Sequence, residues 1–191
     1  MPPPAADVPV APPPPTVDPR PPAGEPLLVL GIDPGLRSTG FGLLRQDGED
    51  IRPIDFGVVA SEATLPLSKR LHQLFTALAG LIERWRPEEV AVEEAFVGAN
   101  KRVAVAMGEA RGAVLLAAAG AGLPVFEYGA AQVKRAVAGY GRGDKGQVQA
   151  MLRLQLGLSE DPQPDHAADA LAVALCHILS RRAARLVEAA P

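Results

Sequence analysis

The order of apolar and polar positions predicts three strands at the start of the folded part of the chain. An apolar run over 27–32 ends on Asp33 and a Pro-Gly turn, as a buried strand would. A glycine-containing segment from Thr39 to Leu44 predicts a second strand that is closely approached by a neighbour, and a third ends at Ala60. Short segments rich in turn residues join the three, so we expect an antiparallel meander.

Helical spacing follows the meander. Apolar residues recur every three or four positions from Leu67 to Trp85, and Pro87 predicts the end of that helix. Further strands are expected at about 90–93 and 123–128, and further helices at about 99–121, 130–138, 144–156 and 165–183. Right-handed crossovers would place the 90–93 strand parallel to the first, so that Asp33 and Glu93 become neighbours. The predicted fold class is α/β, with a five-stranded mixed sheet flanked by helices.

Composition divides the chain into a tail and one domain. Of 191 residues, 1–26 hold 12 of the 20 prolines and almost no large apolar side chains, which predicts a disordered tail. Residues 27–191 suffice for one well-cored domain. The tail lacks the pattern of a signal peptide, and we expect no apolar run long enough to cross a bilayer. The lone Cys176 is interpreted as a small core residue, and a cytoplasmic protein is expected.

The charge is unevenly distributed. The formal net charge is -3, which by itself argues against nucleic-acid binding. Residues 97–153, however, carry eight positive and three negative side chains, a local balance of +5. This stretch indicates either a basic DNA-binding surface or ordinary solvated helix faces, and charge does not choose between them.

Three carboxylates and one imidazole are the candidate chemical groups. Asp33 and Glu93 each end a predicted strand, while His166 and Asp169 lie three apart and share one helical face. Such a cluster suits phosphodiester hydrolysis with two Mg²⁺ ions, because hard cations prefer oxygen ligands. His166 is better suited to Mn²⁺, or to a role as a base or water-orienting group.

Each candidate also has a purely structural interpretation. Asp33-Pro-Gly could be an Asx turn, and His166 could be a cap or surface residue behind Asp165 as the N-cap. Asp169 is a stronger candidate because it lies among alanines and Leu171 on a segment suited to burial, where an unpaired carboxylate would be costly.

Six short motifs carry a family resemblance over about residues 27–184. They are Gly31-Ile-Asp-Pro-Gly-Leu, Ala91-Val-Glu-Glu-Ala-Phe96, Gly108-Glu-Ala-Arg-Gly112, Gln132-Val-Lys134, Lys145-Gly-Gln-Val-Gln149 and Asp165-His-Ala-Ala-Asp-Ala-Leu-Ala. In this order and spacing the chain resembles the RuvC family of bacterial Holliday junction resolvases, which have a ribonuclease-H-like fold. The resemblance implies that the metal-binding catalytic set is Asp33, Glu93, His166 and Asp169. Some members carry aspartate where His166 falls, and Asp165 is assigned a capping or supporting role.

The resemblance also implies substrates and partners. They are a four-way DNA junction, a second copy of the chain in a homodimer, and the RuvA and RuvB branch-migration proteins. The reaction would be paired, symmetric nicking that leaves 5′-phosphate ends, in homologous recombination and DNA repair. The 99–121 helix would form the dimer interface, or its small residues could merely pack under the sheet. The DNA contacts would be Phe96, stacking on an unpaired base, and the cations Lys134, Lys145, Arg102 and Arg142.

Three other classes compete with this interpretation. Actin-like and sugar-kinase ATPases begin on a similar strand and turn, but they need a longer chain with a second phosphate loop. A noncatalytic junction-binding protein would keep Phe96 and the basic surface without needing the acidic ligands. A ribonuclease H acting on RNA–DNA hybrids would use the same metals. Three features separate it from a resolvase: Phe96 on its loop, the lysine pair, and the Gly108-Glu-Ala-Arg-Gly112 helix.

Overall fold

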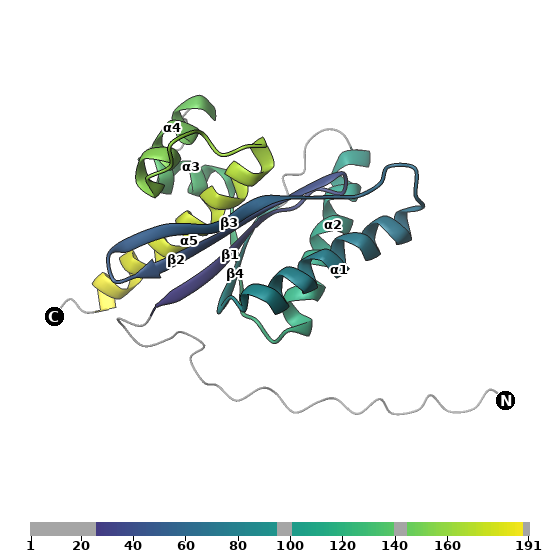
Figure 1. Cartoon of the computed structure of the whole chain (residues 1–191), viewed down its shortest axis with the longest axis horizontal. Coiled ribbons are helices and arrows are strands. Elements are labelled where there is room, and N and C mark those ends of the chain that lie inside the picture. The colour runs from purple at the N-terminus through teal and green to yellow at the C-terminus, as the bar shows by residue number, and fades with distance from the viewer. Residues whose placement is uncertain (1–25, 95–100, 140–144, 189–191) are drawn as a thin grey trace.

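A five-stranded mixed sheet lies between two layers of helices in the computed structural model, which describes residues 26–94, 101–139 and 145–188 (Figure 1). The strand order is β3-β2-β1-β4-β5. The strands are β1 Leu27–Asp33, β2 Ser38–Asp47, β3 Asp50–Ala60, β4 Glu89–Glu93 and β5 Val125–Tyr128. The helices are α1 Leu67–Trp85, α2 Lys101–Gly120, α3 Ala130–Ala138, α4 Lys145–Leu156 and α5 Asp165–Glu188.

The pairing of the strands confirms the predicted topology. β1, β2 and β3 form an antiparallel meander, and β4 pairs with β1 and β5 in parallel. Pro53 lies in β3, an edge strand, where a missing backbone N–H is tolerated. The element order is as predicted, but α5 extends five residues beyond the expected end and β5 begins at Val125 instead of residue 123.

Alternation along the strands decides which side chains face which helical layer. Leu30 of β1 packs in the core cluster that includes α1 and α2, whereas Val29 packs in the cluster that includes α5. Side chains two apart on a strand share a face, so Asp33 lies on the α5 side with Val29. By the same argument Glu93 lies on the α5 side with Ala91 of β4. Both strand-terminal carboxylates therefore face α5.

Glycines in the strands let the backbone of α5 lie almost directly on the sheet. A Cβ atom at Gly40 of β2 would lie 1.8 Å from the carbonyl oxygen of His166, and one at Gly31 of β1 would lie 2.2 Å from that of Ala170. No other amino acid leaves room for this approach. The first turn of α5 is thereby held against the carboxyl end of β1, where Asp33 lies.

Helix α2 corrects one expectation from the sequence. Val103–Gly120 is long and apolar enough, by length and composition, to cross a membrane, although we had expected no such run. One such helix is weak support for a membrane span, since core helices pass the same test. Here Ala110, Val114 and Ala118 are buried in the cluster shared with α1, and Arg111 forms an ion pair of 2.5 Å with Glu127. One face of this helix is thus packed within the domain.

Candidate metal centre

Asp33, His166 and Asp169 converge at the carboxyl end of β1. One ligand atom from each lies within 4.8 Å of the others, as a single bound ion requires. Oδ2 of Asp33 is 2.5 Å from Nδ1 of His166, and the Asp33 residue is only 8% exposed. Burial raises the pKa of Asp33, while the hydrogen bond and charge of His166 oppose that rise.

Glu93 joins this cluster from the end of β4. Its pKa is raised to about 7, first by burial, then by the negative charges of Asp33 and Asp169 and a hydrogen bond with Asp33. The positive charge of Lys134 opposes this rise in pKa but does not cancel it. The four residues that the sequence analysis singled out are therefore brought together, from two strands and one helix.

The chemistry of this cluster fits a divalent cation. Three carboxylates and an imidazole offer oxygen and nitrogen ligands of the kind that Mg²⁺ and Mn²⁺ accept. Burial and the mutual repulsion of the carboxylates together raise the pKa of Glu93, and a bound cation would offset both effects. These four residues are therefore suited to holding a divalent cation.

Lys145, at the start of α4, lies between two acidic residues of α5. Its Nζ is 2.9 Å from Oδ2 of Asp165 and 3.5 Å from Oδ2 of Asp169. Burial alone would lower the pKa of this lysine, but the hydrogen bonds and charges of the two aspartates raise it. Asp165 also accepts a hydrogen bond of 3.2 Å from Gln149. Asp165 therefore forms an ion pair with a lysine beside the cluster.

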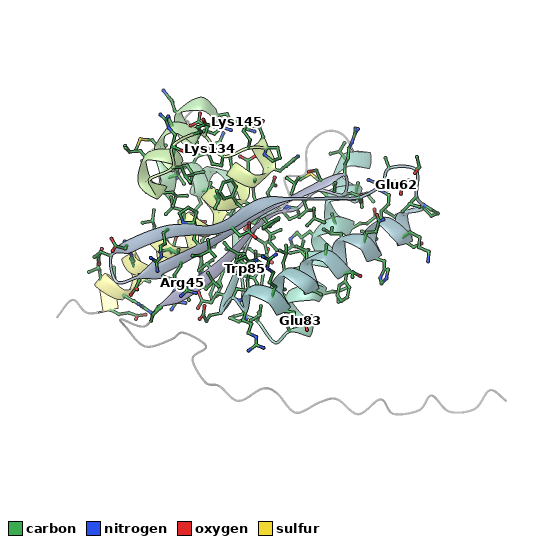
Figure 2. All side chains as sticks on the ribbon, viewed as in Figure 1. Arg45, Glu62, Glu83, Trp85, Lys134 and Lys145 are labelled. Carbon is green, nitrogen blue, oxygen red and sulfur yellow. The ribbon has the colours of Figure 1, made fainter. Side chains whose placement is uncertain are left out.

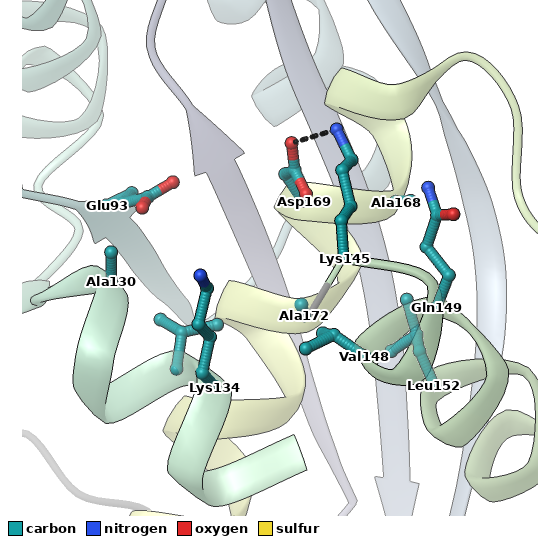
Figure 3. A pocket seen from close by; sticks show the side chains of 11 residues that line it. Glu93, Ala130, Lys134, Lys145, Val148, Gln149, Leu152, Ala168, Asp169 and Ala172 are labelled. Atoms are coloured by element: carbon teal, nitrogen blue, oxygen red, sulfur yellow. Dashed lines mark hydrogen bonds and ion pairs between the residues drawn. The ribbon is translucent and has the colours of Figure 1, made fainter. Parts of the chain in front are cut away.

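A pocket of about 300 Å³ opens directly beside the cluster (Figure 3). Glu93 and Asp169 belong both to its wall and to the acidic cluster. Lys134 of α3 lies on one side and Lys145 of α4 on the other, with α5 between them (Figure 3). Figure 2 shows the two lysines close together at one end of the molecule. The two predicted phosphate-binding lysines therefore flank the predicted metal site.

The remaining predicted DNA contacts are less defined. Phe96 and Arg142 lie outside the described residues. Arg102 lies in the first turn of α2, but its side chain is outside the described part of the structure. Nothing in the structure therefore tests these three.

A buried polar network was missed by the sequence analysis. His177 of α5 contacts Glu89 of β4 through Nε2 at 2.5 Å and Tyr128 of β5 through Nδ1 at 2.7 Å, and Arg181 donates to the same Glu89. Glu89 and His177 are fully buried. A carboxylate facing Arg181 accepts the Nε2 proton, so Nδ1 accepts from the tyrosine hydroxyl. The available signal was the polar pair His177 and Arg181, four apart on one face of an apolar helix.

Comparisons with known proteins give the family to which the chain is related. Residues 29–177 match the family described as "Crossover junction endodeoxyribonuclease RuvC". The protein of that name from Chloroflexus aggregans is 51% identical over 148 residues, covering 78% of this chain and 90% of its own length. The one from Desulfitobacterium hafniense is 50% identical over 151 residues, covering 79% of this chain and 92% of its own. The solved structure "T. thermophilus RuvC in complex with Holliday junction substrate" has a TM-score of 0.79 at 42% identity, covering 83% of this chain and 96% of that one.

The sheet order and the carboxylate cluster at the end of its central strand define the ribonuclease-H-like class of nucleases. Within that class, the chain belongs to the RuvC family of crossover junction endodeoxyribonucleases.

Proposed function

We propose that this protein is a divalent-metal-dependent endonuclease that resolves Holliday junctions by paired, symmetric nicks with 5′-phosphate ends. The observation that carries the proposal is the convergence of Asp33, Glu93, His166 and Asp169 beside two lysines. Membership of the RuvC family supports the substrate, since a Thermus thermophilus relative has been solved with a Holliday junction. The reaction belongs to homologous recombination and DNA repair.

The residues of the cluster have different roles in this proposal. Asp33, the most buried ligand, anchors the site, and its hydrogen bond orients the imidazole of His166. Glu93 and Asp169 reach the edge of the pocket, so they lie where substrate approaches. A divalent cation held by these groups would supply the activation of water and the stabilisation of the leaving oxygen. Mg²⁺ is the expected cofactor, with two ions per site, and His166 is compatible with Mn²⁺ in its place.

The lysines are proposed to bind the DNA backbone. Lys134 and Lys145 flank the pocket from two helices, so a strand crossing the cluster passes between two ammonium groups. Such contacts place a DNA phosphate over the carboxylates without recognising the base sequence. By the family resemblance, Phe96 stacks on an unpaired base, and Arg102 and Arg142 contact the DNA backbone.

A homodimer is proposed, with α2 at its interface. One face of α2 is buried, while Val103, Val105 and Leu116 are each more than half exposed. A two-fold dimer would cover these side chains and present one site to each of two equivalent strands of a junction. RuvA and RuvB are the proposed partners by resemblance. We further propose that the protein is cytoplasmic and that residues 27–191 form the nuclease domain.

The test is cleavage of a synthetic four-way junction by the full chain. We expect symmetric nicks that can be ligated, in Mg²⁺ or Mn²⁺ but not in EDTA, and no cutting of a linear duplex. Asp33→Asn should abolish nicking. Asp47→Asn, an exposed residue at the opposite end of the β1–β2 pair, is the matched control and should cut normally. Tight junction binding without nicks would favour the noncatalytic binder, and cutting confined to RNA–DNA hybrids would favour a ribonuclease H.

A further inference from the structure

The pocket beside the acidic cluster has a largely apolar lining, which neither a metal ion nor a phosphate requires for binding. Its apolar lining is formed by Ala130, Val133, Val148, Leu152, Ala168 and Ala172. Leu152, Ala168 and Ala172 are among the most buried of the described residues, so this part of the pocket lining belongs to the hydrophobic core. Its edge, in contrast, is charged and polar, formed by Glu93, Lys134, Lys145, Gln149 and Asp169.

This division of charge restricts what the pocket can hold. A phosphate would gain nothing from an aliphatic floor, and an apolar peptide side chain would gain nothing from four charged residues around it. The occupant needs a flat or compact apolar body attached to an anionic chain that stays at the edge. A nucleotide has both parts, because the faces of its base are apolar and its phosphates can lie between Lys134 and Lys145.

We propose that the pocket receives a nucleobase of the cleaved strand, from a nucleotide next to the scissile phosphate. The proposal rests on the proposed function, and it makes the pocket a determinant of where the strand is cut. Glu93 and Asp169 are shared by the pocket and the cluster, so a base in the pocket fixes the adjoining phosphate over the metal ligands.

The volume and the substrate are consistent with such an occupant. About 300 Å³ is at the lower end of the range for small-molecule sites and is ample for one base. A base that is unpaired leaves the helical stack at a lower cost than a paired base. The amide of Gln149 lies at the edge of the pocket, where the polar rim of an inserted base would come within reach.

The test combines a missing base with a filled pocket. Single-turnover nicking by the full chain in Mg²⁺ is compared on an intact four-way junction and on junctions with an abasic nucleotide on either side of the cut phosphate. For wild type we expect one of the two abasic junctions to be cut about tenfold more slowly or worse, from the loss of apolar contact with the base. Ala172→Leu and Ala130→Leu should fill the pocket. They should cut the intact junction at the slow rate and show no further loss on the abasic one.

Ala131→Leu is the matched control. It adjoins Ala130 on α3, is exposed and does not line the pocket, so it should keep the tenfold difference between intact and abasic junctions. Ala130 is itself exposed, so its variant keeps the test valid if Ala172→Leu fails to fold. Equal wild-type rates on intact and abasic junctions would overturn the pocket assignment, as would filled variants that lose the same factor on both. Failure of the proposed function is distinguishable, because wild type would then cut no junction at all.

Discussion

Replacing Gly40 with alanine tests how the active site is assembled. Gly40 lies in β2 with ordinary strand backbone, so alanine costs nothing in dihedral strain. The new Cβ would lie 1.8 Å from the carbonyl oxygen of His166, and real contacts of this kind are no closer than 3.0 Å. The first turn of α5 must therefore move away by at least about 1.2 Å. Backbone on both sides makes this displacement unavoidable.

Two effects of different size follow from that displacement. Overpacking of this kind destabilises a protein by about 1–3 kcal/mol. A shift of about 1 Å in a catalytic group can cost on the order of 100-fold in rate, and the moved turn carries His166. We therefore expect Gly40→Ala to remain folded but to cut a four-way junction at least about 100-fold more slowly.

The assay pairs urea unfolding with single-turnover nicking. Gly80→Ala is the control, because Gly80 is exposed in α1 and an added Cβ meets nothing within 4 Å. That change should stabilise the protein by about 0.5–1 kcal/mol and leave nicking unaltered. If Gly40→Ala retained both normal stability and a normal nicking rate, the claim that close backbone contact positions His166 would be refuted.

Three further predictions concern metal, acid and packing. Because the pKa of Glu93 is about 7, protons compete with the cation for this carboxylate near neutral pH. The apparent Mg²⁺ affinity, measured by calorimetry, should therefore fall about tenfold from pH 8 to pH 6. An affinity that did not change with pH would contradict this prediction. Burial lowers the pKa of His177 to about 4 from the usual 6.5, so its contribution to stability is complete above pH 6.5 and is lost as pH falls toward 4. The loss should reach at most about 3 kcal/mol in urea titrations and be reduced in His177→Gln; an unchanged pH dependence in that variant would exclude His177 as its source. Leu78→Ala should lower the free energy of unfolding by about 2–5 kcal/mol, because Leu78 is fully buried in the core cluster that the sheet shares with α2. Nicking should stay normal well below the melting temperature. A loss under about 1 kcal/mol would mean that the side chains around residue 78 move in to fill the cavity.

Much of the fold was predictable because its signals are local. Apolar runs, helical spacing and turn residues predicted, in order, all ten elements found in the described residues, with errors confined to their ends. The handedness of crossovers predicts the parallel pairing of β1 and β4, and with it the proximity of Asp33 and Glu93.

The polar network around His177 was not predictable in this way. Glu89 follows another glutamate and looks like a surface residue, and His177 alone resembles many helical histidines. Only the packing of α5 across β4 and β5 shows that the two meet at 2.5 Å in the core. A contact across 88 positions leaves no periodic trace that a local pattern could reveal.

The sequence by itself determined the element order, the positions of Asp33 and Glu93 at the ends of their strands and the residue types of the site, since these depend on spacing along the chain. Tertiary structure alone decided the distances: the closeness of His166 to Asp33, the raised pKa of Glu93, and the partners of Lys145. It also created the pocket, because a cavity exists only between elements once α3, α4 and α5 have packed. The physical reason is that the periodicity of a sequence sets the direction in which side chains point from a helix or strand. The distances between side chains and the loss of solvent around them arise only when segments distant in the chain come into contact.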